Sequence, residues 1–401
     1  MSFYDQAETR SAEQRFAEHD AALKDQIARA ASLPGAPEAL RAAKGLGLED
    51  LAKVPVLRKG DLMAAQQAHP PLGGLAGPLE GFAHVFQSPG PIYEPGATGR
   101  DWWRFGRFLH ACGIGPGDLV QNCFAYHLTP AGMMFENGAA AVGATVLPAG
   151  TGQTEAQAQA AHHLGSTAYA GTPDYLKVIL DKADEDGLAL KFTKAAVSGG
   201  ALFPSLRTAY AERGIACLQC YATADLGHIA YESSAMEGMI VDEGVIVEIV
   251  TPGTGTPVEP GEVGEIVVTT LNPDYPLIRF ATGDMSAVLP GQSPCGRTNM
   301  RIKGWMGRAD QTTKIKGMFV RPEQVASLVD KLDGVTRARV IAGRTAEVDT
   351  LHVKFEGSAD SATAEAAVQE VLKLRGSVEF VGSGALPRDG VVIEDTRTYD
   401  A

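Results

Sequence analysis

Short apolar segments of strand length alternate with longer segments of helical character between residues 82 and 180. The strand-like segments read LVQNCFAY, ATVLPAG and TAYAG. Helices are expected over WWRFGRFLHACGI, 128–142, EAQAQAAHHLG and PDYLKVILDKADEDG. A chain that alternates in this way crosses back through each helix, which makes neighbouring strands parallel. The sequence therefore predicts an α/β fold, and 401 residues are enough for two or more domains.

The rest of the chain divides into segments of different character. Apolar residues at helical spacing predict a helix over 10–31, and proline-rich connections are expected around 54–80. Residues 240–290 contain strand-like segments separated by turn signals. After GRAD at 307–310 the pattern runs strand, helix, strand, strand, helix. This last part has the size of an independent α+β domain.

Charge and cysteine content limit the partners of the chain. The formal net charge is −13, which argues against nucleic acid or an anionic membrane because both bind basic surfaces. The polar start of the sequence and the lack of a run of 18 apolar residues predict neither a secretion leader nor a membrane span. Five irregularly spaced cysteines are typical of reduced thiols and predict a cytoplasmic protein.

A series of short motifs runs along nearly the whole chain. It comprises FAHVFQSPGPIYEPGATG, LHACGIGPGDLVQN, GATVLPAGTGQTEAQ, LGSTAYAGTPDYL, VSGGALFP, CYATADLG, GEVGEIVVTTL, PLIRFATGDM and RIKGWMGRADQTTKIKGMFVRPEQV. Together, in this order, they resemble the phenylacetate–coenzyme A ligase branch of the adenylate-forming enzymes. The resemblance implies a large N-terminal α/β domain with a β-rich subdomain over 1–308 and a small C-terminal α+β domain over 309–401. It also implies that the small domain rotates about a hinge at Asp310.

The activity that this resemblance implies is activation of a small carboxylic acid with ATP. An acyl adenylate would form first, and the acyl group would then pass to the thiol of coenzyme A. The implied cofactors are ATP or AMP and coenzyme A, with magnesium as a candidate. Few charges in the expected pocket region favour an apolar or aromatic acid, and the frequent dimers among relatives suggest a homodimer by analogy.

Two charged residues are expected to bind the nucleotide. Asp284, in ATGDM, follows a strand-like segment and is an acceptor at neutral pH, and the resemblance assigns both ribose hydroxyls to it. Arg308 can reach the same sugar or a phosphate with its forked donors. Outside this context Asp284 would be interpreted as a turn residue and Arg308 as a surface arginine.

Two further motifs are expected around the adenine and the phosphates. Glycines in the turn after AAV let backbone approach a planar ring closely, and the resemblance places this turn beside adenine, although a plain strand-end turn is the alternative. The turn consists of Ser198, Gly199, Gly200 and Ala201. In the motif YATAD the resemblance assigns the tyrosine to adenine, a hydroxyl to phosphate and the acid to magnesium. These residues are Tyr221, Ala222, Thr223, Ala224 and Asp225.

The YATAD motif differs from its relatives at two positions. The hydroxyl position holds Ala224, with Thr223 beside it, and the acid is Asp225 where relatives have a glutamate. A carboxylate remains a suitable magnesium ligand, although its reach changes. Asp225 and Arg308 are therefore the expected catalytic residues.

The expected acid pocket lies in FAYHLTPAG. The resemblance places Phe124, Tyr126 and His127 along the substrate there. A histidine at this position could pair with the carboxylate of the substrate. The alternative is a histidine packed in the interior.

The segment QSPGPIYEP departs from the family pattern. Relatives carry a Ser/Thr/Gly-rich loop ending in Gly-Lys-Pro, whose backbone, hydroxyls and lysine hold the β- and γ-phosphates. Here prolines remove N–H donors, Ile92 and Tyr93 replace a threonine and a glycine, and Glu94 occupies the lysine position. A charged Glu94 would repel a polyanion. Loss of one such donor typically costs ~10²–10³ in rate.

Two other expected groups are missing. The C-terminal segment LPRDGVVIED places Val391 or Val392 where relatives carry the adenylation lysine, and no lysine follows Lys373. Relatives also carry Cys- and His-containing segments that look zinc-binding, but the corresponding region here keeps only Cys295, so no zinc site is expected. We interpret the C-x-x-C pair Cys217 and Cys220 as buried strand thiols beside a loop histidine, His228.

Three functions remain open at the level of sequence. The first is an acid–coenzyme A ligase that uses other donors. The second is an adenylation-deficient homologue that accepts a preformed acyl adenylate or thioester. The third is a protein that only binds nucleotide, coenzyme A or the acid. We expect an adenosine pocket that lacks the cation for the rest of ATP, and a lysine or arginine from elsewhere beside Glu94 would favour the ligase.

Overall fold

The computed structural model describes residues 2–88, 91–99, 101–200, 202–309, 311, 313–315, 318–345, 348–389 and 391–397. The chain forms two compact units. The first comprises Met1–Val247, Val268–Phe280 and Leu289–Gly304, and the second comprises Glu248–Val267, Ala281–Val288 and Trp305–Ala401. The expected hinge, Asp310, lies outside the described residues, so rotation of a domain about it stays a prediction.

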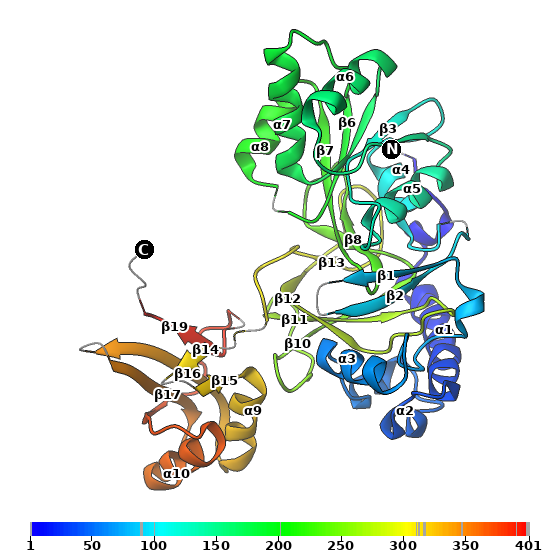
Figure 1. Cartoon of the computed structure of the whole chain (residues 1–401). Coiled ribbons are helices and arrows are strands. Elements are labelled where there is room, and N and C mark those ends of the chain that lie inside the picture. Colours follow the sequence, from blue (N-terminus) through cyan, green and yellow to red (C-terminus); the bar gives the residue numbers. More distant parts are fainter. Residues whose placement is uncertain are drawn as a thin grey trace. The chain divides into compact units, whose positions relative to one another are not determined.

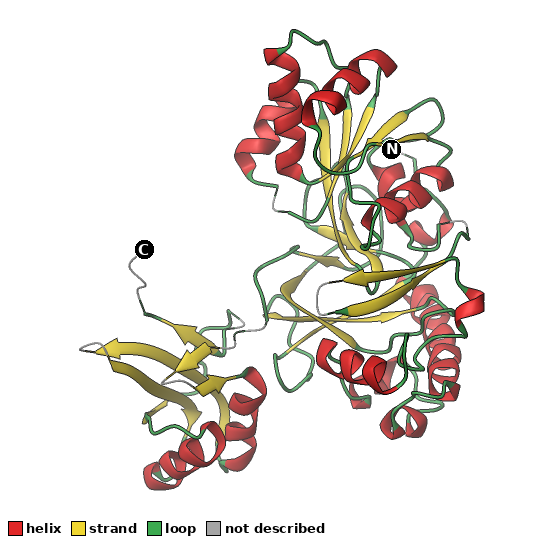
Figure 2. Cartoon of the chain, viewed as in Figure 1, coloured by secondary structure: helices red, strands yellow, loops and turns green. Residues whose placement is uncertain are grey.

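The first unit is built on a run of parallel strands with helices on both faces (Figures 1 and 2). Its parallel strands are β3 (Leu119–Asn122), β4 (Thr145–Pro148), β5 (Ala168–Gly171), β6 (Lys194–Val197) and β7 (Ala216–Thr223). Its helices here are α4 (Phe105–Ala111), α5 (Ala131–Ala141), α6 (Thr154–Leu164), α7 (Pro173–Glu185) and α8 (Pro204–Glu212). The strand order is β4-β3-β5-β6-β7, with every neighbouring pair parallel. The prediction of an α/β fold is confirmed.

Alternation along the strands supplies a core on each face of this sheet. Ala168 and Ala170 of β5 pack into the core that includes α4 and α5, whereas Tyr169 between them packs into the core that includes α6 and α7. In β6, Ala196 likewise faces the first core and Ala195 the second. Successive side chains of a strand point to opposite faces, so strands covered on both faces are apolar at every position.

The predicted helices over this region form, with shifted starts. Helix α4 begins at Phe105 rather than at Trp102 because Arg104 has a left-handed backbone with φ of 66°. Helix α5 begins at Ala131, directly after Pro130, since proline is compatible with a helix start but not with its interior. Trp103 is buried against Phe86.

Antiparallel strands and an N-terminal helical layer complete the first unit. Strand β7 continues into β8 (Gly227–Glu232), β9 (Met239–Val241) and β13 (Arg301–Ile302), all antiparallel. A separate hairpin pairs β1 (His84–Ser88) with β2 (Ile92–Gly96). The remaining elements are η1 (Gln6–Thr9), α1 (Ala12–Ser32), α2 (Glu38–Ala42), η2 (Leu48–Lys53), α3 (Lys59–Ala68) and η3 (Leu79–Gly81). The helix expected over 10–31 is confirmed by α1.

Among the described residues, the second unit contains three groups of strands and two helices. Strands β10 (Val245–Val250), β11 (Val263–Thr270) and β12 (Phe280–Leu289) are neighbours in that order. Each of these strands contains residues of both units. A hairpin of β14 (Thr313–Ile315) and β15 (Met318–Val320) precedes α9 (Pro322–Lys331). The strands β16 (Val335–Thr345), β17 (Val348–Gly357), β18 (Ser377–Val381) and β19 (Ile393–Asp395) form a sheet of order β18-β17-β16-β19, packed with α9 and α10 (Ser361–Leu372). The α+β character of this part was predicted.

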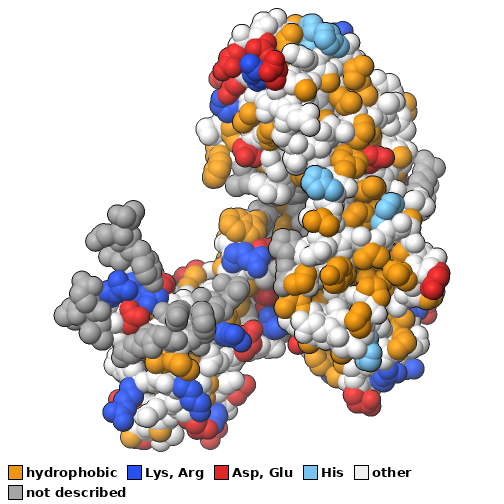
Figure 3. All heavy atoms as spheres, in the orientation of Figure 1, with side chains coloured by type: hydrophobic (Ala, Val, Ile, Leu, Met, Phe, Trp, Pro, Cys, Tyr) orange, Lys and Arg blue, Asp and Glu red, His pale blue; other side chains and the backbone are white. Residues whose placement is uncertain are grey.

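The surface of the α7 and α8 region mixes both signs of charge (Figure 3). Lys177 pairs with Asp181, and Lys182 with Asp186, each one helical turn apart along α7. Within the described residues, no helix combines the length and apolar character that crossing a bilayer requires.

Candidate functional site

The strand order of the first unit reverses at β3. The chain places β4 on one side of β3 and then β5 on the other. In open α/β sheets, ligands bind outside the carboxyl ends of the strands at such a reversal. Phe124, Tyr126 and His127 follow the carboxyl end of β3, and the predicted adenine turn and YATAD motif lie at the ends of β6 and β7.

Part of the expected acid pocket lies beside the expected adenine turn. The Phe124 ring stacks on Phe135 with centroids 4.4 Å apart, and a Cβ built on Gly199 would lie 3.7 Å from the Phe124 ring. The hydroxyl oxygen of Tyr126 accepts a hydrogen bond from Nδ2 of Asn122 at 2.7 Å, and burial raises the pKa of Tyr126 above its usual value. His127 is exposed, so the alternative of an interior histidine is wrong.

The turn after β6 is held against β7. The Ser198 hydroxyl donates to the carbonyl of Cys220 at 3.0 Å. Gly199 has a φ of 71°, a left-handed conformation that glycine adopts without steric cost. Gly200 is exposed, and Ala201 lies outside the described residues. The turn thus presents backbone without side-chain bulk at the ligand-binding edge of the sheet.

The YATAD motif spans the end of β7. Tyr221 is buried, and a β-bulge separates it from Ala222. Thr223 accepts a hydrogen bond from the Leu226 backbone at 3.2 Å through its hydroxyl oxygen. Asp225 is 6% exposed, and its Oδ1 has no hydrogen-bond partner among the described residues.

Glu94 is buried in the β1–β2 hairpin. It pairs with Phe86 in the antiparallel register, which puts both side chains on the face that packs toward Trp103. Glu94 is 1% exposed, and neither carboxylate oxygen makes a hydrogen bond of normal geometry within the described residues. Burial raises the pKa of Glu94 to about 8, with Asp225 acting in the same direction and Ser88 and Lys59 against it.

This raised pKa corrects an expectation from the sequence. At neutral pH a carboxyl group with a pKa of about 8 carries its proton. The raised pKa favours the neutral form of Glu94 in the ligand-free chain, which would weaken the repulsion of a polyanion expected from the sequence. Pro89 and Gly90 of the same segment lie outside the described residues.

A lysine from helix α3 reaches this region. Lys59 Nζ lies 3.4 Å from Asp225 Oδ2, and its charge lowers the pKa of Glu94. Burial nonetheless raises the pKa of Asp225, because desolvation outweighs the effect of Lys59. The expectation that no cation stands beside Glu94 is therefore wrong.

Helix α3 was missed because prolines around it favoured a connection. Between those prolines the sequence reads RKGDLMAAQQA, and the Asp61 side chain accepts from the Arg58 backbone at 2.9 Å, which is a helix-start signal. Gln66, which lies one to two turns further along α3, connects this helix to the β1–β2 hairpin. Its Nε2 donates to the Tyr93 carbonyl at 2.7 Å, and its Oε1 accepts from the Tyr93 N–H at 2.9 Å.

The second unit brings Asp284 and Arg308 together. Arg308 Nη1 donates to Asp284 Oδ1 at 2.8 Å, and the Trp305 indole N–H donates to the same oxygen at 3.1 Å. A bridge pairs the backbones of Asp284 and Arg308, and a Cβ on Gly283 would lie 2.9 Å from Arg308 Nη2. Arg308 remains half-exposed, so its other donors stay open to a ligand.

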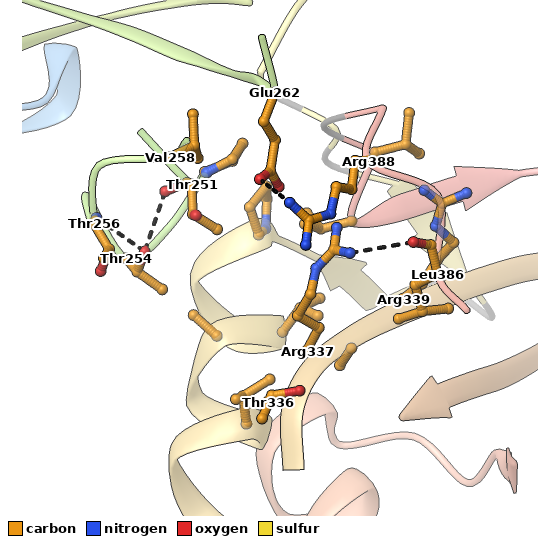
Figure 4. Close-up of a pocket in the computed structure, with 18 of the residues that line it drawn as sticks. Thr251, Thr254, Thr256, Val258, Glu262, Thr336, Arg337, Arg339, Leu386 and Arg388 are labelled. Carbon is orange, nitrogen blue, oxygen red and sulfur yellow. Dashed lines mark hydrogen bonds and ion pairs between the residues drawn. The ribbon is translucent and has the colours of Figure 1, made fainter. Parts of the chain in front are cut away.

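The position of the missing C-terminal lysine lines a pocket of about 470 Å³ in the second unit (Figure 4). Val391 and Val392 line it together with three arginines, Arg337, Arg339 and Arg388. Arg337 donates to the Leu386 and Pro387 carbonyls, and Arg339 pairs with Glu394 at 3.3 Å. Arg388 is more exposed and lies 3.4 Å from Glu262.

Cys217, Cys220 and His228 lie in the interior of the first unit. Cys217 and Cys220 are buried in β7, as expected. His228 is not in a loop but buried in β8, with Nδ1 3.5 Å from Asp242, and burial lowers its pKa. Within the described part of the chain, no three His, Cys, Asp or Glu side chains gather to hold a metal ion.

Comparison with known proteins gives consistent results. Residues 116–272 match the family model described as AMP-binding enzyme. Phenylacetate-coenzyme A ligase of Escherichia coli strain K12 is 30% identical over 79% of this chain and 75% of its own length, and that of Aromatoleum evansii is 30% identical over 77% and 72%. An open-conformation crystal structure of 2-hydroxyisobutyryl-CoA ligase in complex with 2-HIB-AMP and CoA is similar, with a TM-score of 0.72, 25% identity and coverage of 95% of this chain and 91% of that chain.

Proposed function

The chain belongs to the phenylacetate–coenzyme A ligase family of adenylate-forming enzymes, and from this premise we infer that it activates a carboxylic acid with ATP and transfers the acyl group to coenzyme A. The observation that carries the proposal is Lys59 at 3.4 Å from Asp225. It supplies a positive charge where the loop sequence had removed one. A chain that retained this charge by another route has the means to hold the phosphates of ATP.

Lys59 is proposed to bind the phosphates. Its ammonium offers three donors, and its side chain is 43% exposed, so a ligand can reach it. In the ligand-free chain it neutralises Asp225. With ATP bound, it would turn toward a phosphate oxygen and oppose the charge that develops as pyrophosphate leaves.

Asp225 is proposed to hold the magnesium ion of MgATP. Its unpartnered, buried Oδ1 fits that group, since carboxylate oxygens are preferred ligands of magnesium. When bound, magnesium supplies neutralisation of phosphate charge. Asp225 would determine the position of the magnesium ion relative to the phosphates.

The remaining nucleotide contacts are proposed from the predicted residues. Ser198, Gly199 and Gly200, with Tyr221, would border the adenine, because the turn exposes backbone at the carboxyl edge of the sheet. Asp284 would accept from the ribose hydroxyls, and the free donors of half-exposed Arg308 would bind the sugar or a phosphate.

The acid would bind after β3. Phe124 supplies an apolar wall beside Gly199, and exposed His127 offers a ring nitrogen to the substrate carboxylate. Orienting the carboxylate toward the α-phosphate is the contribution expected from these residues, since correct placement lowers the entropic part of the barrier.

The second candidate function is an adenylation-deficient homologue. The observation that favours it is the loop composition, which still lacks the hydroxyls and N–H groups of its relatives. Lys59 and membership of the ligase family favour the first proposal.

The test is incubation of the purified chain with ATP, magnesium and a panel of aromatic and aliphatic acids, with and without coenzyme A. Pyrophosphate release with an acid, and a thioester when coenzyme A is added, would support the ligase. Thioester exchange without ATP would support the second candidate. Binding of nucleotide without either reaction would contradict both. A homodimer and a cytoplasmic location belong to the same proposal by analogy with relatives.

A further inference from the structure

We propose that Glu94 and Asp225 together bind a divalent cation, so that the position where relatives carry the loop lysine contributes a metal ligand in this chain. The proposal rests on the proposed function only in taking MgATP as the physiological source of the cation. It makes Glu94 a second metal ligand beside Asp225.

The first support is burial without partners. Glu94 is 1% exposed and Asp225 is 6% exposed. Both oxygens of Glu94 and Oδ1 of Asp225 lack a hydrogen-bond partner among the described residues. Buried carboxyl groups are normally hydrogen-bonded, paired or bound to a metal, so three unsatisfied oxygens on two acids indicate a missing ligand.

The two groups belong to one electrostatic environment. The segments that carry the two acids both pack against Trp103: a Cβ on Gly96, two residues after Glu94, would lie 2.8 Å from the Trp103 ring, and a Cβ on Gly227, two residues after Asp225, would lie 2.9 Å from the Trp103 carbonyl oxygen. In keeping with this placement, Asp225 adds to the rise in the pKa of Glu94. Strand β2 contributes Glu94, and the segment after β7 contributes Asp225. Two elements distant in sequence thus direct acids into the same buried space.

The balance of charge points to a cation. Lys59 lies 3.4 Å from Asp225 and provides one positive charge for two carboxyl groups. A single lysine balances the charge of one carboxylate, and a further cation is needed to balance the other. A divalent cation would satisfy both carboxylates and release Lys59 for a phosphate.

The number of acids fits magnesium rather than calcium or zinc. Magnesium is usually held by one or two carboxylates, with substrate phosphates and water completing its shell. Calcium takes more protein oxygens, and zinc sites use cysteine or histidine ligands. Within the part of the chain that the structure describes, no larger cluster of His, Cys, Asp or Glu side chains is placed to hold a metal.

The experiment measures binding of Mn²⁺ alone, as a paramagnetic substitute for Mg²⁺, by electron paramagnetic resonance. Titrations compare the unchanged chain with Glu94→Gln, Asp225→Asn and the matched control Glu80→Gln, which changes an exposed glutamate. Both site variants preserve side-chain size. Their thermal unfolding is recorded to check that they fold.

One Mn²⁺ per chain is expected, with affinity lowered at least ~10-fold in Glu94→Gln and in Asp225→Asn and unchanged in Glu80→Gln. Equal affinity in Glu94→Gln and the unchanged chain would overturn the proposal and leave Glu94 as a neutral hydrogen-bonding group. Failure of the unchanged chain to bind Mn²⁺ would also overturn it. Should a site variant not fold, Mn²⁺ must raise the melting temperature of the unchanged chain and Glu80→Gln alike, and no rise would count against the site.

The outcome is separable from that of the proposed function. Metal binding is read without ATP or acid, so Mn²⁺ can bind to a chain that forms no adenylate. In that case the activity proposal fails and the metal site stands. If the chain releases pyrophosphate in the presence of an acid but Glu94→Gln binds Mn²⁺ as tightly as the unchanged chain, the activity proposal stands and the metal site fails.

Discussion

Lys59, the first residue of helix α3, places its Nζ 3.4 Å from Oδ2 of Asp225, two residues beyond the end of strand β7. The two residues are 166 positions apart, yet they form an ion pair in which the Asp225 side chain is 2% exposed. We propose that this cation compensates for a loop that carries Glu94 in place of a lysine. Helix α3, which carries Lys59, also contacts the hairpin of Glu94 through the hydrogen bonds of Gln66 to Tyr93.

We predict that Lys59→Met abolishes most of the ATP-dependent half-reaction. Loss of the cation removes a donor to the phosphates and leaves Asp225 without its ion-pair partner, which together should reduce pyrophosphate release by ~10²–10³. Time-course assays of pyrophosphate release, with the acid of the panel that gives the highest rate, measure this reduction. Thioester formation from a chemically prepared acyl adenylate should change much less, because pyrophosphate has already left.

Two variants control this prediction. Lys59→Arg keeps the charge and should retain more activity than Lys59→Met. Lys53→Met removes an exposed lysine that pairs with Asp50 and should leave the rate unchanged. If Lys59→Met releases pyrophosphate as fast as the unchanged chain, Lys59 does not bind the phosphates.

Gln66→Ala should destabilise the first unit. Gln66 is buried and makes two hydrogen bonds to the backbone of Tyr93 at 2.7 and 2.9 Å, so its loss leaves a backbone donor and acceptor unpaired at a cost of about 1–3 kcal/mol. Chemical denaturation measures the change in the free energy of unfolding. The matched control is Gln67→Ala, which changes the next residue, an exposed glutamine. If the two changes lowered the free energy of unfolding equally, the hydrogen bonds of Gln66 to Tyr93 would not be the source of the stabilisation.

Much of the fold follows from local sequence patterns. The alternation over 82–180 predicted β3, β4 and β5 with the helices between them, because strand and helix periods are properties of consecutive residues. The start of α4 was misplaced since nothing local announces the left-handed backbone of Arg104. Helix α3 was missed because flanking prolines suggested a connection, although Asp61 gave a start signal.

The candidate site was less predictable for a physical reason. Ser198 and Tyr221 could be placed near strand ends because the strands themselves were predicted, whereas the predicted strand LVQNCFAY included Phe124 and the observed β3 ends earlier, at Asn122. The ionisation of Glu94 depends on its burial, and burial depends on which tertiary face of the hairpin packs inward. The approach of Lys59 to Asp225 depends on packing between segments distant in the chain, which no spacing rule encodes.

Asp284→Ala should weaken binding of AMP and ATP. Asp284 accepts from Arg308 and Trp305, and we propose that it also accepts from the ribose. Charged hydrogen bonds of this kind correspond to about 10- to 100-fold in affinity, which calorimetry with AMP measures. Asp274→Ala is the control, since it removes another carboxylate–indole contact, to Trp102; it should not change nucleotide affinity. Unaltered affinity in Asp284→Ala would exclude the ribose contact.

The last prediction concerns pH and Asp101. Burial raises the pKa of Asp101 from 3.8 to about 6, with Asp242 adding to the rise and the Gly106 N–H, Arg104 and Arg107 opposing it. Between pH 4 and 6 the folded chain therefore binds more protons at this group than the unfolded chain does. The contribution of Asp101 to the free energy of unfolding is fully present below pH 4 and is lost as the pH rises through 6.

Asp101→Asn should remove this part of the pH dependence and stabilise the chain at pH 7. Asparagine keeps the acceptor for the Gly106 N–H and tolerates the φ of 53° at this position. A shift of about two pH units corresponds to at most about 3 kcal/mol, and the partial exposure of Asp101 makes the gain smaller. Denaturation of both proteins at pH 4 and pH 7 measures it, with Asp25→Asn as an exposed control. A gain at pH 4 equal to that at pH 7 would show that the buried charge is not its cause, because at pH 4 Asp101 already carries its proton in the folded chain.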